Sequence, residues 1–205
     1  MNRYVIIFLI CALSFGCTPK TKTDSGQIVS TNSVSEGSST SGIHGGSPAP
    51  EAWSDCGGMI GDHPCDFSLV DQNGDTFTLY NNYGKLIVLD FSAVWCSVCN
   101  DMASDANRLA SDYSNRDFLW VTVLLENSQG YPTTNEDVAG WVAKHGISDS
   151  PVLAGNSDLI DLTAEGGWPI NSWPTLVILD REMIIKYGIH GWSETTVRGW
   201  VESEL

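Results

Sequence analysis

The pair Cys96 and Cys99 offers the richest chemistry in this chain of 205 residues. The apolar run Leu86-Ile87-Val88-Leu89, followed by Asp90-Phe91, predicts a buried strand at 85–91 before the pair. Residues 97–113 follow the pair with apolar positions at helical spacing. Two cysteines at this spacing can close a small disulfide ring and open it again. Cys96 should lie at the helix N-terminus, where free backbone N–H groups favour a thiolate and lower the thiol pKa. The pattern therefore predicts thiol–disulfide exchange.

Residues 1–16 have the pattern of a secretory signal peptide. Arg3 gives a positive start, and the apolar run 4–13 is too short to span a bilayer comfortably. The segment that ends at Cys17 resembles the lipobox of bacterial lipoproteins, in which the chain is cleaved before a cysteine that becomes diacylated. It departs from that motif at Ser14, where Leu is usual. The alternatives are an ordinary signal peptide cut elsewhere and an uncleaved anchor.

Residues 17–52 are predicted to be a lipidated cysteine followed by a disordered tether. More than half of the positions from 18 to 50 are Ser, Thr or Gly and none is aromatic, so this segment cannot bury enough apolar surface to fold. Residues 53–205 hold enough apolar material for one domain. The formal net charge of −15 argues against nucleic acid as a partner.

A second pair of cysteines, Cys56 and Cys65, has eight residues between its members. In an exported protein, two cysteines this close most simply form a structural disulfide. Two alternatives stay open. One is a metal site that adds His63, although the sequence offers no convincing fourth ligand. The other is a second redox pair that relays electrons to the first.

The order of the predicted elements indicates an α/β fold. Continuous apolar runs on either side of a helix imply a right-handed parallel crossover, and the hairpins around it make the central sheet mixed. Flanking helices then cover the sheet. The predicted elements are a β-hairpin at 67–79, a strand–helix–strand unit at 85–125, an inserted helix at 134–146 with a short strand at 151–154, a hairpin with strands Thr175–Leu179 and Met183–Tyr187, and a last helix capped by Ser193.

The chain from residue 61 to its end resembles the thioredoxin superfamily, specifically the exported TlpA/ResA-like redoxins. This resemblance implies a thioredoxin-like fold, thiol–disulfide oxidoreductase activity and no cofactor. It also implies partners of two kinds: thiols and disulfides of exported proteins, and a membrane or periplasmic electron donor or acceptor. The motifs that carry it are Gly61-Asp62-His63-Pro64-Cys65-Asp66-Phe67-Ser68-Leu69, Gly84-Lys85, Trp95-Cys96-Ser97-Val98-Cys99 and Trp173-Pro174-Thr175.

The resemblance also implies a role for each residue of the redox site. Cys96 attacks a substrate sulfur as a thiolate and Cys99 resolves the mixed disulfide. Asp90 stands where thioredoxins keep a buried carboxylate, whose raised pKa suits it to accept the proton of Cys99. Many ResA-like proteins carry a Glu at the position of Met102, so more weight falls here on Asp90. The alternative is that Asp90 is a strand-end residue that reaches solvent or a backbone donor.

Pro174 is expected to be cis and to pack beside the disulfide, which leaves the backbone of Trp173 free to pair with a substrate strand. Trp95, Trp173 and Trp192 are expected to form an apolar platform for substrate, unless they belong to the core. With the signal sequence, this predicts an exported protein of the bacterial cell envelope, attached to the membrane through a lipid and facing the periplasm or the exterior.

Three other functions compete with this one. Peroxiredoxin-type peroxidases share the fold but use a Thr or Ser three residues before the reactive Cys, where this chain has Ala93. Copper-binding redoxin modules use a longer cysteine spacing and a distant His, for which His190 is the available residue. A tethered domain with a merely structural Cys96–Cys99 staple is the third. No resident metal is expected at the redox pair.

Overall fold

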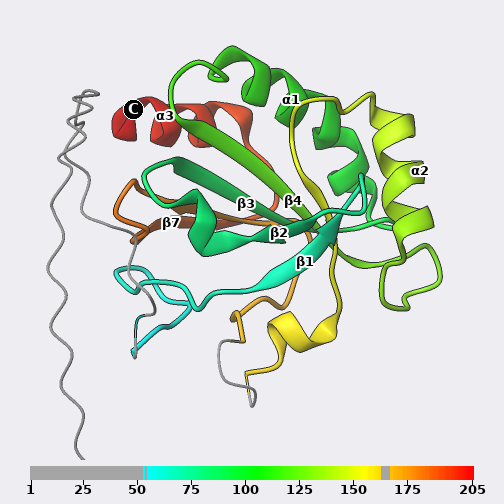
Figure 1. Ribbon diagram of the computed structural model, residues 1–205. Coiled ribbons are helices and arrows are strands. Elements are labelled where there is room, and N and C mark those ends of the chain that lie inside the picture. The colour runs from blue at the N-terminus through cyan, green and yellow to red at the C-terminus, as the bar shows by residue number, and fades with distance from the viewer. Residues whose placement is uncertain (1–52, 54, 163–166) are drawn as a thin grey trace, which may run out of the picture. The chain divides into compact units, whose positions relative to one another are not determined.

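The computed structural model describes residues 53, 55–162 and 167–205, and the other residues are drawn in grey in Figure 1. The predicted signal peptide, the lipidated Cys17 and the tether lie outside these described residues, so the structure leaves those predictions as they stand. Within the described ranges, none of the helices combines the length and the apolar character needed to cross a bilayer.

The described residues form one mixed sheet of seven strands in the order β2-β1-β5-β4-β3-β6-β7. The interior strand β3 pairs in parallel with β4 and antiparallel with β6. This arrangement confirms the predicted α/β class with a mixed sheet. The strands are β1 (Ser68–Asp71), β2 (Thr76–Thr78), β3 (Leu86–Ala93), β4 (Phe118–Glu126), β5 (Val152–Ala154), β6 (Thr175–Leu179) and β7 (Ile185–His190).

The helices α1 (Ser97–Asp112) and α3 (Glu194–Glu204) cover one face of this sheet, as Figure 1 shows. Because side chains alternate along a strand, Leu86 and Val88 of β3 pack under these helices while their neighbours point to the other face. That other face is covered by the 3₁₀ helix η1 (Leu79–Asn82) and by Trp168. The buried strand β3 therefore has a packed apolar layer on each side.

The predicted inserted unit is present as α2 (Asn135–His145) followed by β5. Thr134 caps α2: its hydroxyl accepts from the amide of Asp137, whose carboxylate accepts in return from the amide of Thr134. Gly146 ends the helix in the left-handed conformation, at φ 64°. A second 3₁₀ helix, η2 (Ser157–Ile160), follows β5.

The last hairpin differs from the prediction in its second strand, which was placed at Met183–Tyr187. Met183 has a positive φ of 60° and belongs to the turn, where its amide donates to the carbonyl of Asp180. Strand β7 therefore begins at Ile185. It continues to His190 because His190 pairs with Thr175 at the start of β6.

The segment before β1 is closed into a ring by a disulfide between Cys56 and Cys65. Two backbone hydrogen bonds fasten the ring to β7: the amide of Gly61 donates to the carbonyl of Ile185, and the amide of Ile185 donates to that of Asp62. His63, the residue considered as a metal ligand, stacks on Trp53 at 4.0 Å between ring centroids. Its Nδ1 lies 3.1 Å from the carbonyl oxygen of Met183.

Replacement of both cysteines, Cys56→Ser with Cys65→Ser, is expected to lower the free energy of unfolding by about 2–3 kcal/mol, because opening so short a ring enlarges the unfolded ensemble. Urea denaturation of the oxidised proteins measures the difference. The pair Cys96→Ser and Cys99→Ser, which opens a smaller ring, serves as the control. An unchanged unfolding midpoint, or a Cys56–Cys65 potential equal to that of Cys96–Cys99, would favour the relay function instead.

Candidate active site

The structure joins Cys96 and Cys99 in a disulfide at the start of α1. Cys96 is the N-cap residue, and its Sγ accepts a hydrogen bond of 3.1 Å from the backbone N–H of Cys99. Cys96 keeps 5% of its surface exposed, whereas Cys99 is fully buried. An incoming sulfur can therefore reach only Cys96.

Asn100 holds the turn that carries Cys96 in place. Its Nδ2 donates to the carbonyl of Val94 at 3.0 Å and to that of Cys96 at 2.7 Å. Its Oδ1 accepts from Lys144 Nζ at 2.6 Å and lies 3.2 Å from His145 Nε2. Burial lowers the pKa of His145, and the nearby positive charge of Lys144 lowers it further. The end of α2 thus fixes the active-site turn through one amide group.

This contact was not predicted from the sequence. Asn100 follows the cysteine pair directly, and Lys144 and His145 end the predicted inserted helix, so all three residues were in view. No spacing rule connects them, because they are 44 and 45 positions apart and meet only when α2 packs beside α1.

Asp90 is buried on β3 with 2% of its surface exposed. Its carboxylate accepts from the hydroxyl of Ser92 at 2.5 Å and from that of Thr122 at 3.1 Å. Burial raises the pKa of Asp90 to about 7, and these hydroxyl hydrogen bonds offset only part of that rise. The alternative of a solvent-facing carboxylate at the strand end was wrong.

The loop before β6 contains a cis peptide bond between Trp173 and Pro174. The carbonyl of Pro174 accepts from the amide of Gly191 at 2.8 Å, which ties this loop to the end of β7. The hydroxyl of Thr175 donates to the carbonyl of Ser172 at 2.7 Å, closing the turn. The loop is therefore held on both sides of the proline.

The three tryptophans expected to form one platform are placed differently. Trp173 packs against the cluster that contains Cys96 and Cys99. Trp95 is 54% exposed and its indole N–H donates to Glu126 at 2.7 Å. Trp192 does not join them: it lies edge-on to Trp120 under α1 and α3. Its ring packs against the apolar cluster between the sheet and these two helices. The platform prediction was therefore wrong for Trp192.

The structure also shows the surroundings of Ala93 and His190, the residues on which the peroxidase and copper-binding alternatives depend. Ala93, three positions before Cys96, is fully buried and supplies no hydroxyl to the cysteine. His190 is held by two hydroxyl groups, with Nδ1 at 2.9 Å from Thr175 Oγ1 and 3.0 Å from Ser172 Oγ.

Asp90→Asn is expected to remove a pH-dependent part of stability. In the wild type, the unfolded carboxyl ionises near pH 4 while the folded one stays neutral up to about pH 7. The neutral carboxyl therefore makes its full contribution to the free energy of unfolding below pH 4. This contribution is lost as the pH rises from 4 to about 7. The loss amounts to as much as about 4 kcal/mol relative to the variant.

Urea denaturation at a series of pH values from 4 to 8 measures this difference between wild type and Asp90→Asn. Asp101→Asn, which removes an exposed carboxylate of α1, is the matched control and should follow the wild-type curve. Parallel curves for wild type and Asp90→Asn would contradict the raised pKa.

Sequence comparison gives two kinds of match. The model of the AhpC/TSA family matches residues 60–188. The thioredoxin-like protein YneN of Bacillus subtilis is 23% identical over 121 residues, which are 59% of this chain and 65% of YneN. This chain thus spans just under two thirds of that relative. A putative thioredoxin H10 of Arabidopsis thaliana is 36% identical over 61 residues, 30% of this chain and 38% of the relative.

Solved structures share the fold at low sequence identity. A putative thiol:disulfide interchange protein DsbE from Chlorobium tepidum superposes with a TM-score of 0.58 at 19% identity, covering 72% of this chain and 99% of its own. An exposed lipoprotein thioredoxin from Streptococcus pneumoniae superposes with a TM-score of 0.56 at 24% identity, covering 68% and 99%. The predicted thioredoxin-like fold is confirmed. Because the family model covers more than half of the sequence, this chain belongs to the AhpC/TSA family.

Proposed function

We propose that this protein is a thiol–disulfide oxidoreductase that works through Cys96 and Cys99. One observation carries the proposal: a disulfide lies at the start of helix α1, and of its two cysteines only Cys96 keeps exposed surface. The family match supports it, as do structural relatives whose names describe thiol:disulfide interchange. Ala93 gives no support to a peroxidase, because it cannot donate a hydrogen bond to peroxide.

The exchange proceeds in two steps. In the reduced protein, the Cys96 thiolate attacks one sulfur of a substrate disulfide, so a Cys96–substrate bond forms and the other substrate sulfur leaves as a thiolate. Cys99 then loses its proton and attacks the Cys96 sulfur. This step re-forms the Cys96–Cys99 disulfide and releases the second substrate thiolate. Two electrons pass to the substrate, and the reverse sequence oxidises a dithiol.

Asp90 is suited to take the proton of Cys99 in the second step. It lies on β3, where the alternation of side chains puts it on the same face as Leu86 and Val88, which pack under α1. Its pKa of about 7 lets it gain and lose a proton near neutral pH. The position of Met102, where many ResA-like proteins have a Glu, is buried and apolar here. Asp90 is then the carboxyl group of this chain that acts in the proton transfer.

The substrates proposed are exported proteins with thiols or disulfides, which meet the site at Trp95, Trp173 and Pro174. Trp95 and Val98 are 54% and 45% exposed beside the disulfide, so they offer apolar contact to a polypeptide. The backbone of Trp173 is the proposed partner for an extended substrate strand. A membrane or periplasmic protein supplies or removes the electrons.

The protein is further proposed to be exported and attached to a membrane through a lipid on Cys17. The signal-like residues 1–16 and the cysteine that follows support this, as does a Cys56–Cys65 disulfide, which suits an oxidising compartment. One structural relative is named an exposed lipoprotein thioredoxin. In this proposal, residues 17–52 hold the domain at 53–205 away from the membrane surface.

Substitution of the two cysteines tests the order of attack. Cys96→Ser should abolish the reduction of insulin disulfides by dithiothreitol, because the accessible cysteine of the Cys96–Cys99 pair is gone. Cys99→Ser should accumulate mixed disulfides through Cys96, visible on a non-reducing gel, because nothing resolves them. Mixed disulfides trapped through Cys99 in the Cys96→Ser variant would reverse the assignment.

Labelling tests the anchor. Radioactive palmitate supplied to growing bacteria should enter the wild-type protein and stay absent from Cys17→Ala, which should then leave the membrane fraction. Cys11→Ala, a change of the other cysteine near the N-terminus, should label like the wild type. Equal labelling of all three proteins would show that Cys17 is not the lipid site.

A further inference from the structure

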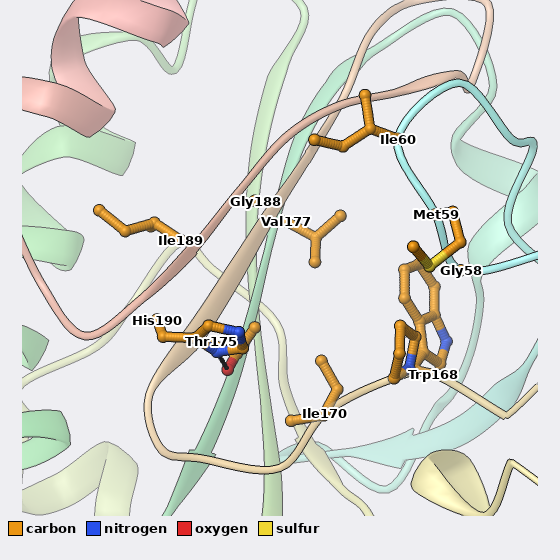
Figure 2. Close-up of a pocket in the computed structure, with 11 residues that line it drawn as sticks. Gly58, Met59, Ile60, Trp168, Ile170, Thr175, Val177, Gly188, Ile189 and His190 are labelled. Atoms are coloured by element: carbon orange, nitrogen blue, oxygen red, sulfur yellow. Dashed lines mark hydrogen bonds between the residues drawn. The ribbon is translucent and has the colours of Figure 1, made fainter.

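A cavity of about 260 Å³ opens on the face of the sheet opposite α1, and Figure 2 shows the side chains that line it. Its floor is made by β6 and β7, where Val177 pairs with Gly188 and Thr175 pairs with His190. Paired residues of neighbouring strands share a face, so all four border the same space. The two walls are the segment Trp168-Pro169-Ile170 and the segment Gly58-Met59-Ile60.

The cavity has the character of a site for an apolar side chain. Its floor is open at Gly188, where an added Cβ would meet nothing nearer than the carbonyl oxygen of Leu176 at 3.8 Å. Met59 and Ile60 at the rim are 64% and 69% exposed. Among the residues that the structure describes, no Asp or Glu lines it. Exposed apolar surface of this kind marks a binding site.

The wall at Met59 and Ile60 is fixed in place because it lies inside the ring closed by Cys56 and Cys65. The ring packs directly on the opposite wall: a Cβ added to Gly58 would come within 2.5 Å of the Pro169 ring. The disulfide and this close approach together preform the cavity, so little ordering is needed when it is filled.

The cavity adjoins the redox site. Its floor begins at Thr175, the residue after Pro174, and Trp173 packs both against the cysteine cluster and against the cluster that contains Trp168 and Val177. Trp173 therefore packs between the cysteine cluster and the cluster that supplies Trp168 and Val177 to the cavity. A substrate chain that reaches Cys96 past Trp173 continues toward the cavity.

The backbone of β7 also suits an extended partner. β7 is an edge strand, and the amide of Gly191 donates to Pro174 and so faces β6. Alternation along the strand turns the backbone groups of Gly188 and His190 outward. An extended polypeptide can add to such an edge, with its side chains entering neighbouring pockets.

We propose that this cavity binds an apolar side chain of an extended, incompletely folded substrate segment that flanks the disulfide under attack. This inference rests on the proposed function and names its substrate class: polypeptides that still expose apolar sequence, in preference to small disulfides. The Cys56–Cys65 ring acts as the fixed wall of this site.

Gly188→Leu tests the proposal, because the new side chain fills the cavity from its floor. The matched control is Gly199→Leu on the exposed side of α3, where an added Cβ meets nothing within 4 Å. Turnover is measured on insulin, a polypeptide disulfide, and on oxidised glutathione, which has no apolar segment. We expect kcat/KM for insulin to fall about 10-fold in Gly188→Leu, the value of one lost apolar side-chain contact. Glutathione turnover, and both activities of the control, should equal the wild type.

Met59→Ser provides a second variant that leaves the fold intact, because this side chain is exposed. It should lower insulin turnover and spare glutathione turnover. Unchanged insulin turnover in both folded variants would overturn the proposal. If either variant sediments differently from the wild type while its insulin turnover is unchanged, the cavity instead binds a second copy of the chain. A wild type that reduces neither substrate would instead contradict the proposed function itself.

Discussion

The hydrogen bond from the Cys99 amide to the Cys96 sulfur is the interaction on which this site depends. The first amides of a helix have no partner within the helix, so the sulfur that caps them is stabilised when it becomes a thiolate. Strand β3 ends three residues before Cys96 and so places it at the N-terminus of α1. All eight of its residues are buried, and it is paired with β4 on one side and β6 on the other. The sheet thus fixes where the helix begins.

Polar groups near this strand are costly to bury and are arranged around the cysteines. Asp90 is desolvated beneath α1, and two hydroxyl groups satisfy its oxygens without restoring its ordinary pKa. Asn100 binds the carbonyls of the active-site turn and is itself bound by Lys144. Burial of Asp90 lowers the stability of the protein at neutral pH, but it also gives a carboxyl group that can exchange a proton near pH 7. Such a group fits the proposed resolution step.

Local patterns in the sequence were sufficient for most of the fold. The apolar runs located β3 and β4, the cysteine spacing located the start of α1, and Thr134 with Gly146 delimited α2. The features that escaped prediction depend on how distant segments pack. Trp192 turned toward Trp120, Asn100 met the end of α2, and the cavity needed the Cys56–Cys65 ring to dock on β7. Periodicity and spacing along the chain carry no information about such contacts.

The central claim is that reduced Cys96 is the accessible, stabilised thiolate. Alkylation of the reduced active-site pair by iodoacetamide, followed by mass spectrometry across a pH series, measures it directly. The account predicts that Cys96 reacts first, with a midpoint below the usual thiol pKa of about 8.5, and that Cys99 reacts slowly at every pH. Faster alkylation of Cys99, or a Cys96 midpoint at or above 8.5, would contradict it.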